Sequence, residues 1–287
     1  MGRKRKETKT GLGPEQQQLN NVSAGEAQVE RKERKELRQV FPPGTTLTVY
    51  ECLFYPHDFF FYVAKEIKTG LPEKVIHNTA LLYALNRDVE ALHRTASGQI
   101  PHYNEDAYKF KIYSTPAMLA DINTIKDANR VLIGKNELLW ESSQDLVRFT
   151  FNSVHTVTQS TQDQNVNLPA LGWYLKYPPL VPFRAFVFGS QPPPPLVRLG
   201  KKPVPIRIRV KEVKGTVEEG RFECAHPVNI RDLPEETKLL SGSMIVMPPI
   251  PLFIRCILEG LFVRLKNEMG ECVVLPDLNN YPNVKVN

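Results

Sequence analysis

Apolar and charged side chains alternate most regularly in the segment VPIRIRVK, which runs from Val204 to Lys211. Valine and isoleucine fill alternate positions, and Arg207, Arg209 and Lys211 stand between them. A period of two is typical of a β-strand that buries one face. The pattern therefore predicts a strand with three cations in a row, spaced about 7 Å apart on one surface. Pro205 lacks a backbone donor and favours a position near a sheet edge.

The same reasoning predicts the other elements of the chain. The segment HNTALLYALNR, which begins at His77, has helical spacing, and Asn78 is the predicted N-cap. A second helix is predicted near Met118–Asn129, and the aromatic segment Phe54–Val63 is predicted to be a loop or a short strand. Alternation and β-branched content predict strands at Thr46–Leu53, Lys109–Ser114, Leu146–Val154, Phe183–Phe188, Arg221–Ala225, Ser243–Met247, Leu261–Lys266 and Glu271–Leu275.

A polar and aromatic stretch separates the predicted strands Leu146–Val154 and Phe183–Phe188. Two strands around such an insert suggest a long β-hairpin that projects from the sheet. Its tip would carry three aromatic residues and a cation: Trp173, Tyr174, Lys176 and Tyr177. These side chains either stack on nucleic-acid bases or fold back and seal the tip, and the sequence leaves both open.

Basic residues are concentrated in one part of the chain. The segment from Lys176 to Lys214 holds nine lysines and arginines and one acidic residue, so its net charge of +8 exceeds the +6 of the whole chain. A concentrated basic patch is the electrostatic footprint of a polyanionic partner. The plainer alternative is a solvated face beside a proline-rich loop.

The turn RLGKKP joins the proline-rich corner to the basic strand. Gly200 permits close backbone approach, and the three cations around it are suited to clamping a phosphate. The predicted strand Leu146–Val154 adds Arg148 on its polar face. The candidate nucleic-acid-binding residues are therefore Arg148, Arg198, Lys201, Lys202, Arg207, Arg209 and Lys211.

Motifs and composition exclude several function classes. No apolar run approaches the roughly 20 residues that a bilayer crossing needs, and no secretory signal is visible, so no membrane partner is expected. The cysteines form no CxxC pair and the histidines show no ligand spacing, so no metal is expected. GxxxxGK[ST], GxGxxG and GxSxG are all missing from the sequence, so we assign neither a nucleotide cofactor nor catalytic residues.

The chain is predicted to divide into a tail and one folded domain. Residues 1–40 are highly charged and poor in large apolar side chains, which predicts a disordered tail. Residues 41–287 carry the predicted strands and helices and form the domain. Four widely separated cysteines are typical of buried thiols in a reducing cytoplasm.

Several segments, in this order, resemble the Csc-one family, the Cas-five-type subunits of type I-D CRISPR effector complexes. They are HNTALLYAL from His77, IPHYNEDAYKFKIYSTPA from Ile100, VRFTFNSV from Val147, VRLGKKPVPIRIRV from Val197 and GSMIVMPPIPL from Gly242. The resemblance covers roughly residues 46–255. It implies an α+β fold with a ferredoxin-like, RRM-like RAMP core of order βαββαβ, and a β-hairpin thumb at about residues 146–188. The glycine-rich RNA-binding loop that many RAMP proteins carry near the C-terminus is not evident in the sequence.

The resemblance also implies a function. Such a subunit is expected to cap the 5′ handle of the CRISPR RNA without cutting it, in the cytoplasm. Its expected partners are the backbone repeat subunit, the large subunit, and target DNA near the protospacer-adjacent motif. Two alternatives stay open: a metal-independent endoribonuclease that cuts repeat RNA, and a scaffold that binds only proteins.

Overall fold

A computed structural model describes residues 41–62, 69–70, 72–89, 92, 102–120, 146–154, 169–199 and 204–287. The tail predicted at residues 1–40 lies outside the described residues. The described chain is mostly β-structure with few helices. No described helix has both the length and the apolar character needed to cross a membrane.

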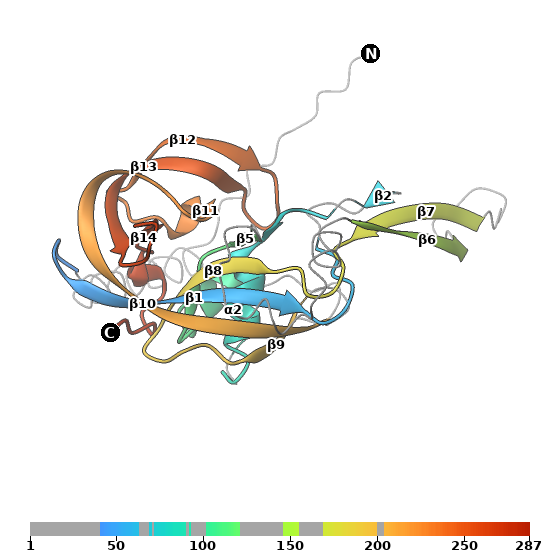
Figure 1. Ribbon diagram of the computed structural model, residues 1–287, viewed down its shortest axis with the longest axis horizontal. Helices are drawn as coiled ribbons and strands as arrows, with labels where there is room; N and C mark the ends of the chain where they lie inside the picture. Colours follow the sequence, from blue (N-terminus) through green and yellow to red (C-terminus); the bar gives the residue numbers. More distant parts are fainter. Residues whose placement is uncertain are drawn as a thin grey trace, which may run out of the picture. The chain divides into compact units, whose positions relative to one another are not determined.

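A large antiparallel sheet carries most of the strands (Figure 1). Its members are β1 (Thr46–Pro56), β3 (Val75–Ile76), β4 (Tyr113–Ser114), β5 (Ala117–Leu119), β8 (Phe183–Phe188), β9 (Leu196–Leu199), β10 (Val204–Glu223), β11 (Val228–Asn229), β12 (Lys238–Ile245), β13 (Leu252–Leu265) and β14 (Cys272–Val274). A separate small sheet holds β2 (Thr69–Gly70), β6 (Val147–Val154) and β7 (Pro169–Lys176). The helices are α2 (Asn78–Leu85) and α3 (Tyr103–Ala107), with the 3-10 turns η2 (Ile230–Asp232) and η3 (Leu278–Asn280).

The centre of the large sheet has the strand order β10-β1-β8-β5, and α2 lies in the chain between β1 and β5. This order and the first four elements agree with the predicted βαββαβ succession. The second helix is not found where that succession needs it, between β8 and β10. Residues 189–199 there form a proline-rich connection and the strand β9, so the full ferredoxin-like arrangement is not confirmed.

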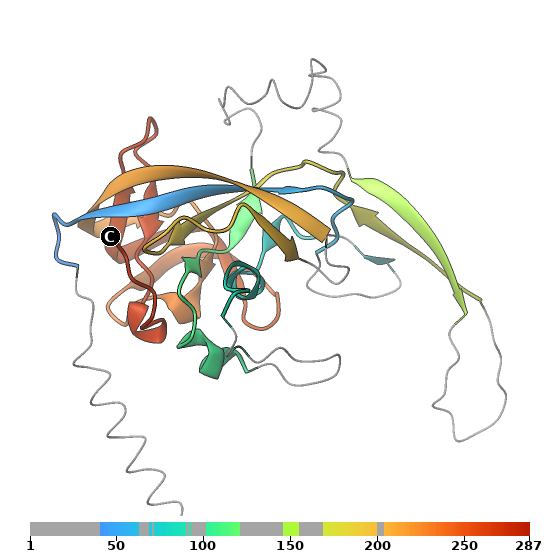
Figure 2. The same ribbon diagram turned by 90° about the horizontal axis from the view of Figure 1, so that it is seen from below.

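The helix α2 begins one residue differently from the prediction. His77 is its N-cap, and the Nδ1 atom of His77 accepts a hydrogen bond from the backbone N–H of Thr79 at 3.1 Å. Asn78 is instead the first helical residue, and its buried side chain donates to Asp232. In Figure 2, α2 lies below β1 and β10, and it packs on the sheet face that carries Ile206.

The buried face of β10 changes along its 20 residues. Ile206 and Ile208 are buried on the face that α2 covers. Val213 and Val217, on the opposite face, are buried in a second cluster. The pairing of β10 with β1 has no register shift, so this change reflects packing on both faces of the sheet rather than a bulge. The predicted alternation is therefore confirmed for residues 204–209, where the face that α2 covers is buried and the other face is open.

Several predicted elements were wrong in extent or type. The helix expected from Met118 begins instead as the strand β5, because Met118 pairs with Val75 and Arg184. The strand expected at Lys109–Ser114 shrinks to β4, since the N–H of Lys109 bonds to Asp106 in a turn after α3. The remainder of that helix, residues 121–129, lies outside the described residues.

The predicted hairpin paired the wrong strands. β6 and β8 are close to their predicted bounds, but β6 pairs with β7, and β8 lies between β1 and β5 in the large sheet. The insert therefore contains a strand of its own. Residues 155–168, which join β6 to β7, lie outside the described residues.

Candidate nucleic-acid interface

Four cations lie on one face of the large sheet, which we call the basic face: Arg198, Arg207, Arg209 and Lys211. Along β10, Arg207, Arg209 and Lys211 occupy alternate positions, opposite Tyr55, Leu53 and Glu51 of β1. Alternate residues of a strand point to the same side, so the three cations share a face, about 7 Å apart. This confirms the row predicted from the sequence.

Arg198 extends the basic face onto a neighbouring strand. In β9, Val197 and Leu199 are buried against the α2 side, whereas Arg198 is exposed and lies opposite Pro205 of β10. Pro205 alternates in phase with Arg207, so Arg198 stands on the same side of the sheet. Lys201 and Lys202 lie outside the described residues.

The cations of the basic face are available to a ligand. Arg198, Arg207 and Lys211 are exposed, and Arg209 is half-buried with its Cζ over the ring of Tyr55, 5.4 Å from the centroid. Within the described part of the chain, no carboxylate forms an ion pair with any of the four. Cations in a row that have no carboxylate partner and are at least partly exposed can neutralise successive phosphates.

Carboxylates mark one end of the basic face. Arg184 of β8 donates from Nε to Glu51 at 2.7 Å and from Nη1 to Glu271 at 2.7 Å, and all three side chains are mostly buried. Burial alone would raise the pKa of Glu271, but its hydrogen bonds to Arg184 hold that pKa below the usual value. Beyond this cluster the same face of β10 continues into the buried Val213. A polyanion that follows the row therefore has to turn away after Lys211.

The predicted aromatic tip is not a tip in the structure. Trp173 and Tyr174 are residues of β7, paired on one side with β6 and on the other with β2. Lys176 ends β7 opposite Val147. The ring of Tyr177 is only 2% exposed and packs edge-on against Phe183, so of the two alternatives left open for this residue the structure favours the one in which it folds back on the body.

The backbone places Arg148 in β6, opposite Leu175 of β7. This strand belongs to the small sheet, whereas the basic face belongs to the large one. The structure thus brings together four of the predicted nucleic-acid-binding residues, and assigns Arg148 to a different sheet.

Sequence reasoning missed one residue beside the basic face. His57 is exposed, and its backbone N–H donates to the carbonyl of Pro205 at 2.9 Å. The sequence predicts a loop or a short strand over the aromatic segment Phe54–Val63, which holds His57, and gives this residue no functional role. The β1 pairing in fact continues through Pro56, opposite Ile206.

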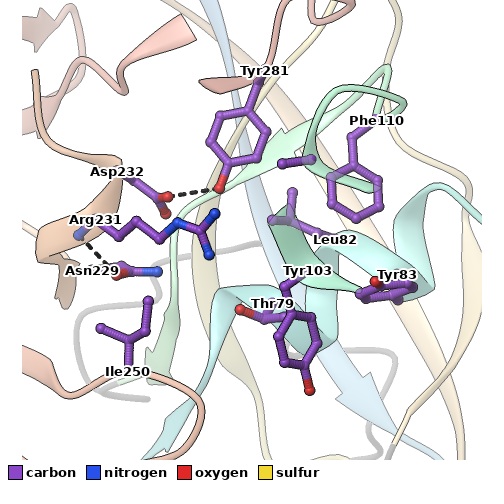
Figure 3. A pocket seen from close by; sticks show the side chains of 11 residues that line it. Thr79, Leu82, Tyr83, Tyr103, Phe110, Asn229, Arg231, Asp232, Ile250 and Tyr281 are labelled. Atoms are coloured by element: carbon purple, nitrogen blue, oxygen red, sulfur yellow. Dashed lines mark hydrogen bonds between the residues drawn. The ribbon is translucent and has the colours of Figure 1, made fainter. Parts of the chain in front are cut away.

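Figure 3 shows a pocket between α2, α3 and the C-terminal turns, beside the buried carboxyl of Asp232. Tyr281 donates to Asp232 Oδ1 at 2.6 Å, and Tyr113 and Asn78 donate to Oδ2. Burial raises the pKa of Asp232, although these donors oppose the shift. Because both oxygens already accept hydrogen bonds, we interpret Asp232 as a structural junction.

Two described histidines are structural as well. His77 and His226 are buried, which lowers the pKa of each to about 4. Their ring nitrogens contact backbone groups: His77 at Thr79 and Ile250, and His226 at Pro227 and Val274. The described residues contain no cluster of side chains that could hold a metal ion.

A row of unpaired cations on an antiparallel sheet is the kind of surface that polyanion-binding proteins present. The family model for "Type I-D CRISPR-associated protein Cas5/Csc1" matches residues 47–282. The chain therefore belongs to this family, and it is a subunit of a CRISPR effector complex in antiviral defence. The resemblance drawn from the sequence is confirmed.

No curated protein matches the chain. Four chains of solved structures do. One is a chain of the cryo-EM structure of the Type III-B Cmr-beta bound to cognate target RNA and AMPPnP, state 1. It is 12% identical, the match covers 74% of this chain and 85% of that chain, and the TM-score is 0.37.

Proposed function

We propose that this subunit binds the 5′ handle of the CRISPR RNA through the basic face and caps it without cutting it. The family supports membership of a CRISPR effector. The observation that carries the finer assignment is the row of Arg207, Arg209 and Lys211, exposed or half-buried, with Arg198 beside it.

Electrostatics favour a single nucleic-acid strand along this row. Two-residue steps of a β-strand, about 7 Å each, are similar to the spacing of phosphates along an extended strand. Each phosphate that a cation neutralises releases condensed counterions, so affinity falls as salt rises. The carboxylates of Glu51 and Glu271 repel a backbone that would continue past Lys211. Because the row of cations stops at these carboxylates, the surface is suited to the end of an RNA strand rather than to its middle.

The proposal extends to the partners of the capped RNA. The subunit would contact the backbone repeat subunit and the large subunit, in the cytoplasm, and lie near the protospacer-adjacent motif of target DNA. A low-resolution image of the assembled effector tests this placement. The chain should be found at the 5′ end of the RNA, and a position at the 3′ end would overturn it.

The direct test is a salt titration of RNA binding by the full chain. Handle RNA is titrated by fluorescence anisotropy at several salt concentrations, with Arg207→Ala and with Arg207→Ala combined with Arg209→Ala. For a single strand, each lost phosphate contact reduces the slope of log K against log salt by about 0.7. Arg221→Ala is a matched control, because Arg221 is an exposed arginine of the same strand beyond the basic face. Unchanged slopes in both basic-face variants would remove these residues from the site.

A capping role also requires that the bound RNA stays intact. His77 and His226 are engaged with the backbone, and neither ring is placed to act as a base, so among the described histidines the exposed His57 is the one beside the basic face that a cleavage reaction would have to use. The pure chain is incubated with repeat RNA in EDTA and the products are separated on a gel. Intact RNA is the expected result. Cleavage at one site would favour the metal-independent endoribonuclease instead.

A further inference from the structure

Arg209 differs from the other cations of the basic face in what its side chain contacts. Its Cζ lies over the Tyr55 ring, whereas no such ring contact is found for Arg198, Arg207 or Lys211 among the described residues. Arg209 is also half-buried, while the other three are exposed. The guanidinium of Arg209 is therefore supported from one side by an aromatic ring.

The supporting ring is fixed in the protein. Tyr55 is 7% exposed and belongs to a small apolar cluster with Leu53 and Ala120, against which Leu180 packs. Tyr55 lies opposite Arg207 in the strand pairing, so Arg209 reaches its ring diagonally across the two strands. A side chain held in this way loses little further freedom when a ligand binds.

A ring-supported guanidinium is suited to a different contact from a free cation. Phosphate neutralisation needs only a positive charge, and Lys211 or Arg207 supplies it. A planar, weakly hydrated guanidinium can also stack, which an ammonium group cannot do. Unstacked nucleic-acid bases bind to aromatic rings and to the planes of arginine side chains.

We propose that Arg209 holds a nucleobase by stacking, while Arg207 and Lys211 contact the phosphates on either side. This inference rests on the proposed function, and it assigns the ligand at this point as single-stranded. The bases of a duplex are stacked on each other and cannot reach a guanidinium on a sheet face. From Arg207 to Lys211 the strand spans about 13 Å, or about two phosphate-to-phosphate steps, so the two cations can contact the outer phosphates of a two-nucleotide segment while one base of that segment stacks on Arg209.

The test compares two substitutions that preserve charge, Arg209→Lys and Arg207→Lys, in the full chain. Binding is measured by anisotropy with a short single-stranded RNA, with an abasic oligonucleotide of the same length, and with an RNA duplex. We expect Arg209→Lys to weaken binding of the single-stranded RNA by roughly 5- to 10-fold, since stacking on one base is lost. Arg207→Lys should stay within about twofold of the wild type, because its contact needs charge alone.

The abasic oligonucleotide separates stacking from charge. With no bases to stack, the wild type and Arg209→Lys should bind it equally, and they should also bind the duplex equally. If Arg209→Lys weakens all three ligands alike, or none, the stacking role is overturned while the proposed function stands. If the wild type binds neither single-stranded ligand at physiological salt, the proposed function and the inference fall together.

Discussion

Arg184 and Glu271 form a two-pronged ion pair between β8 and the residue just before β14, across 87 positions of sequence. The Nη1–Oε1 distance is 2.7 Å, and Asn267 donates to the same carboxylate. Glu51 of β1 binds the Nε atom of Arg184. One guanidinium thus ties the centre of the sheet to its C-terminal part and balances one of the two carboxylate charges, so the end of the basic face keeps a net negative charge.

Replacing Arg184 should destabilise the fold strongly. Arg184→Met leaves Glu51 and Glu271 without their cation, and these side chains are only 17% and 15% exposed. Removing one partner of a buried ion pair leaves uncompensated charge, so we expect a loss of about 2–4 kcal/mol in the free energy of unfolding, measured in urea. Arg264→Met is the matched control, because the Arg264–Glu218 pair is exposed and should cost less than about 1 kcal/mol. Equal losses in the two variants would contradict this account.

The same ion pair predicts a pH dependence. Its hydrogen bonds lower the pKa of Glu271 in the folded state, so the stability it contributes is present above the unfolded pKa of about 4.3 and is lost as pH falls further. The difference in unfolding free energy between the wild type and Arg184→Met should therefore shrink below pH about 4. A difference that stays constant to lower pH would show that Glu271 does not carry the effect.

The local pattern of the sequence predicted the basic row because a strand's faces follow from its own alternation. VPIRIRVK specified which side chains share a side before any partner strand was known. The one exception is Val210, placed among the buried residues, which is 36% exposed. Val210 lies between the part of β10 that is buried on the side of Ile208 and the part that is buried on the side of Val213. Which side is buried depends on the segments that pack there, and those are distant in the sequence.

Strand partners and ion pairs could not be predicted in the same way. β6 and β8 have similar length and composition, so nothing local showed that β6 pairs with a strand inside the supposed insert. Arg184 was counted among the basic residues of the segment, but its charge is taken up by Glu51 and Glu271 from two other parts of the chain. The contact of the Arg209 guanidinium with the Tyr55 ring likewise depends on β1 and β10 being neighbours.

The buried histidines should make the fold sensitive to mild acid. Burial lowers the pKa of His77 and of His226 to about 4, and the charge of Arg184 adds to the effect at His226. The unfolded chain binds these protons near pH 6.5, so stability should fall as pH drops from about 6.5 to 4, by about 1.4 kcal/mol per pH unit for each histidine.

Urea unfolding across this pH range checks that prediction. His226→Gln should reduce the slope by about half, because only His77 then contributes. The Glu271 effect lies at lower pH and is separable. A variant that kept the full wild-type slope would mean that His226 is not the buried neutral group described here.

The Asp232 junction should depend on each of its donors. Tyr281→Phe removes the hydroxyl that bonds to Asp232 Oδ1 and leaves a buried carboxyl less well satisfied. We expect a loss of about 2 kcal/mol in the free energy of unfolding. Tyr103→Phe is a suitable control, because its hydroxyl has no hydrogen bond within the described residues and its ring packs on Tyr83. Similar losses in both variants would argue against the junction.

The basic face should be distinguishable from the opposite face of the same sheet by its effect on RNA binding. Arg198 lies on the basic face, whereas Lys214 is exposed on the other side of β10, opposite Thr48. If RNA follows the basic face, Arg198→Ala should reduce the slope of log K against log salt by about 0.7, and Lys214→Ala should leave it unchanged. The measurement is the same anisotropy titration at several salt concentrations. Equal reductions from both substitutions would mean that RNA responds to the general positive charge of the segment, and the assignment to one face would be wrong.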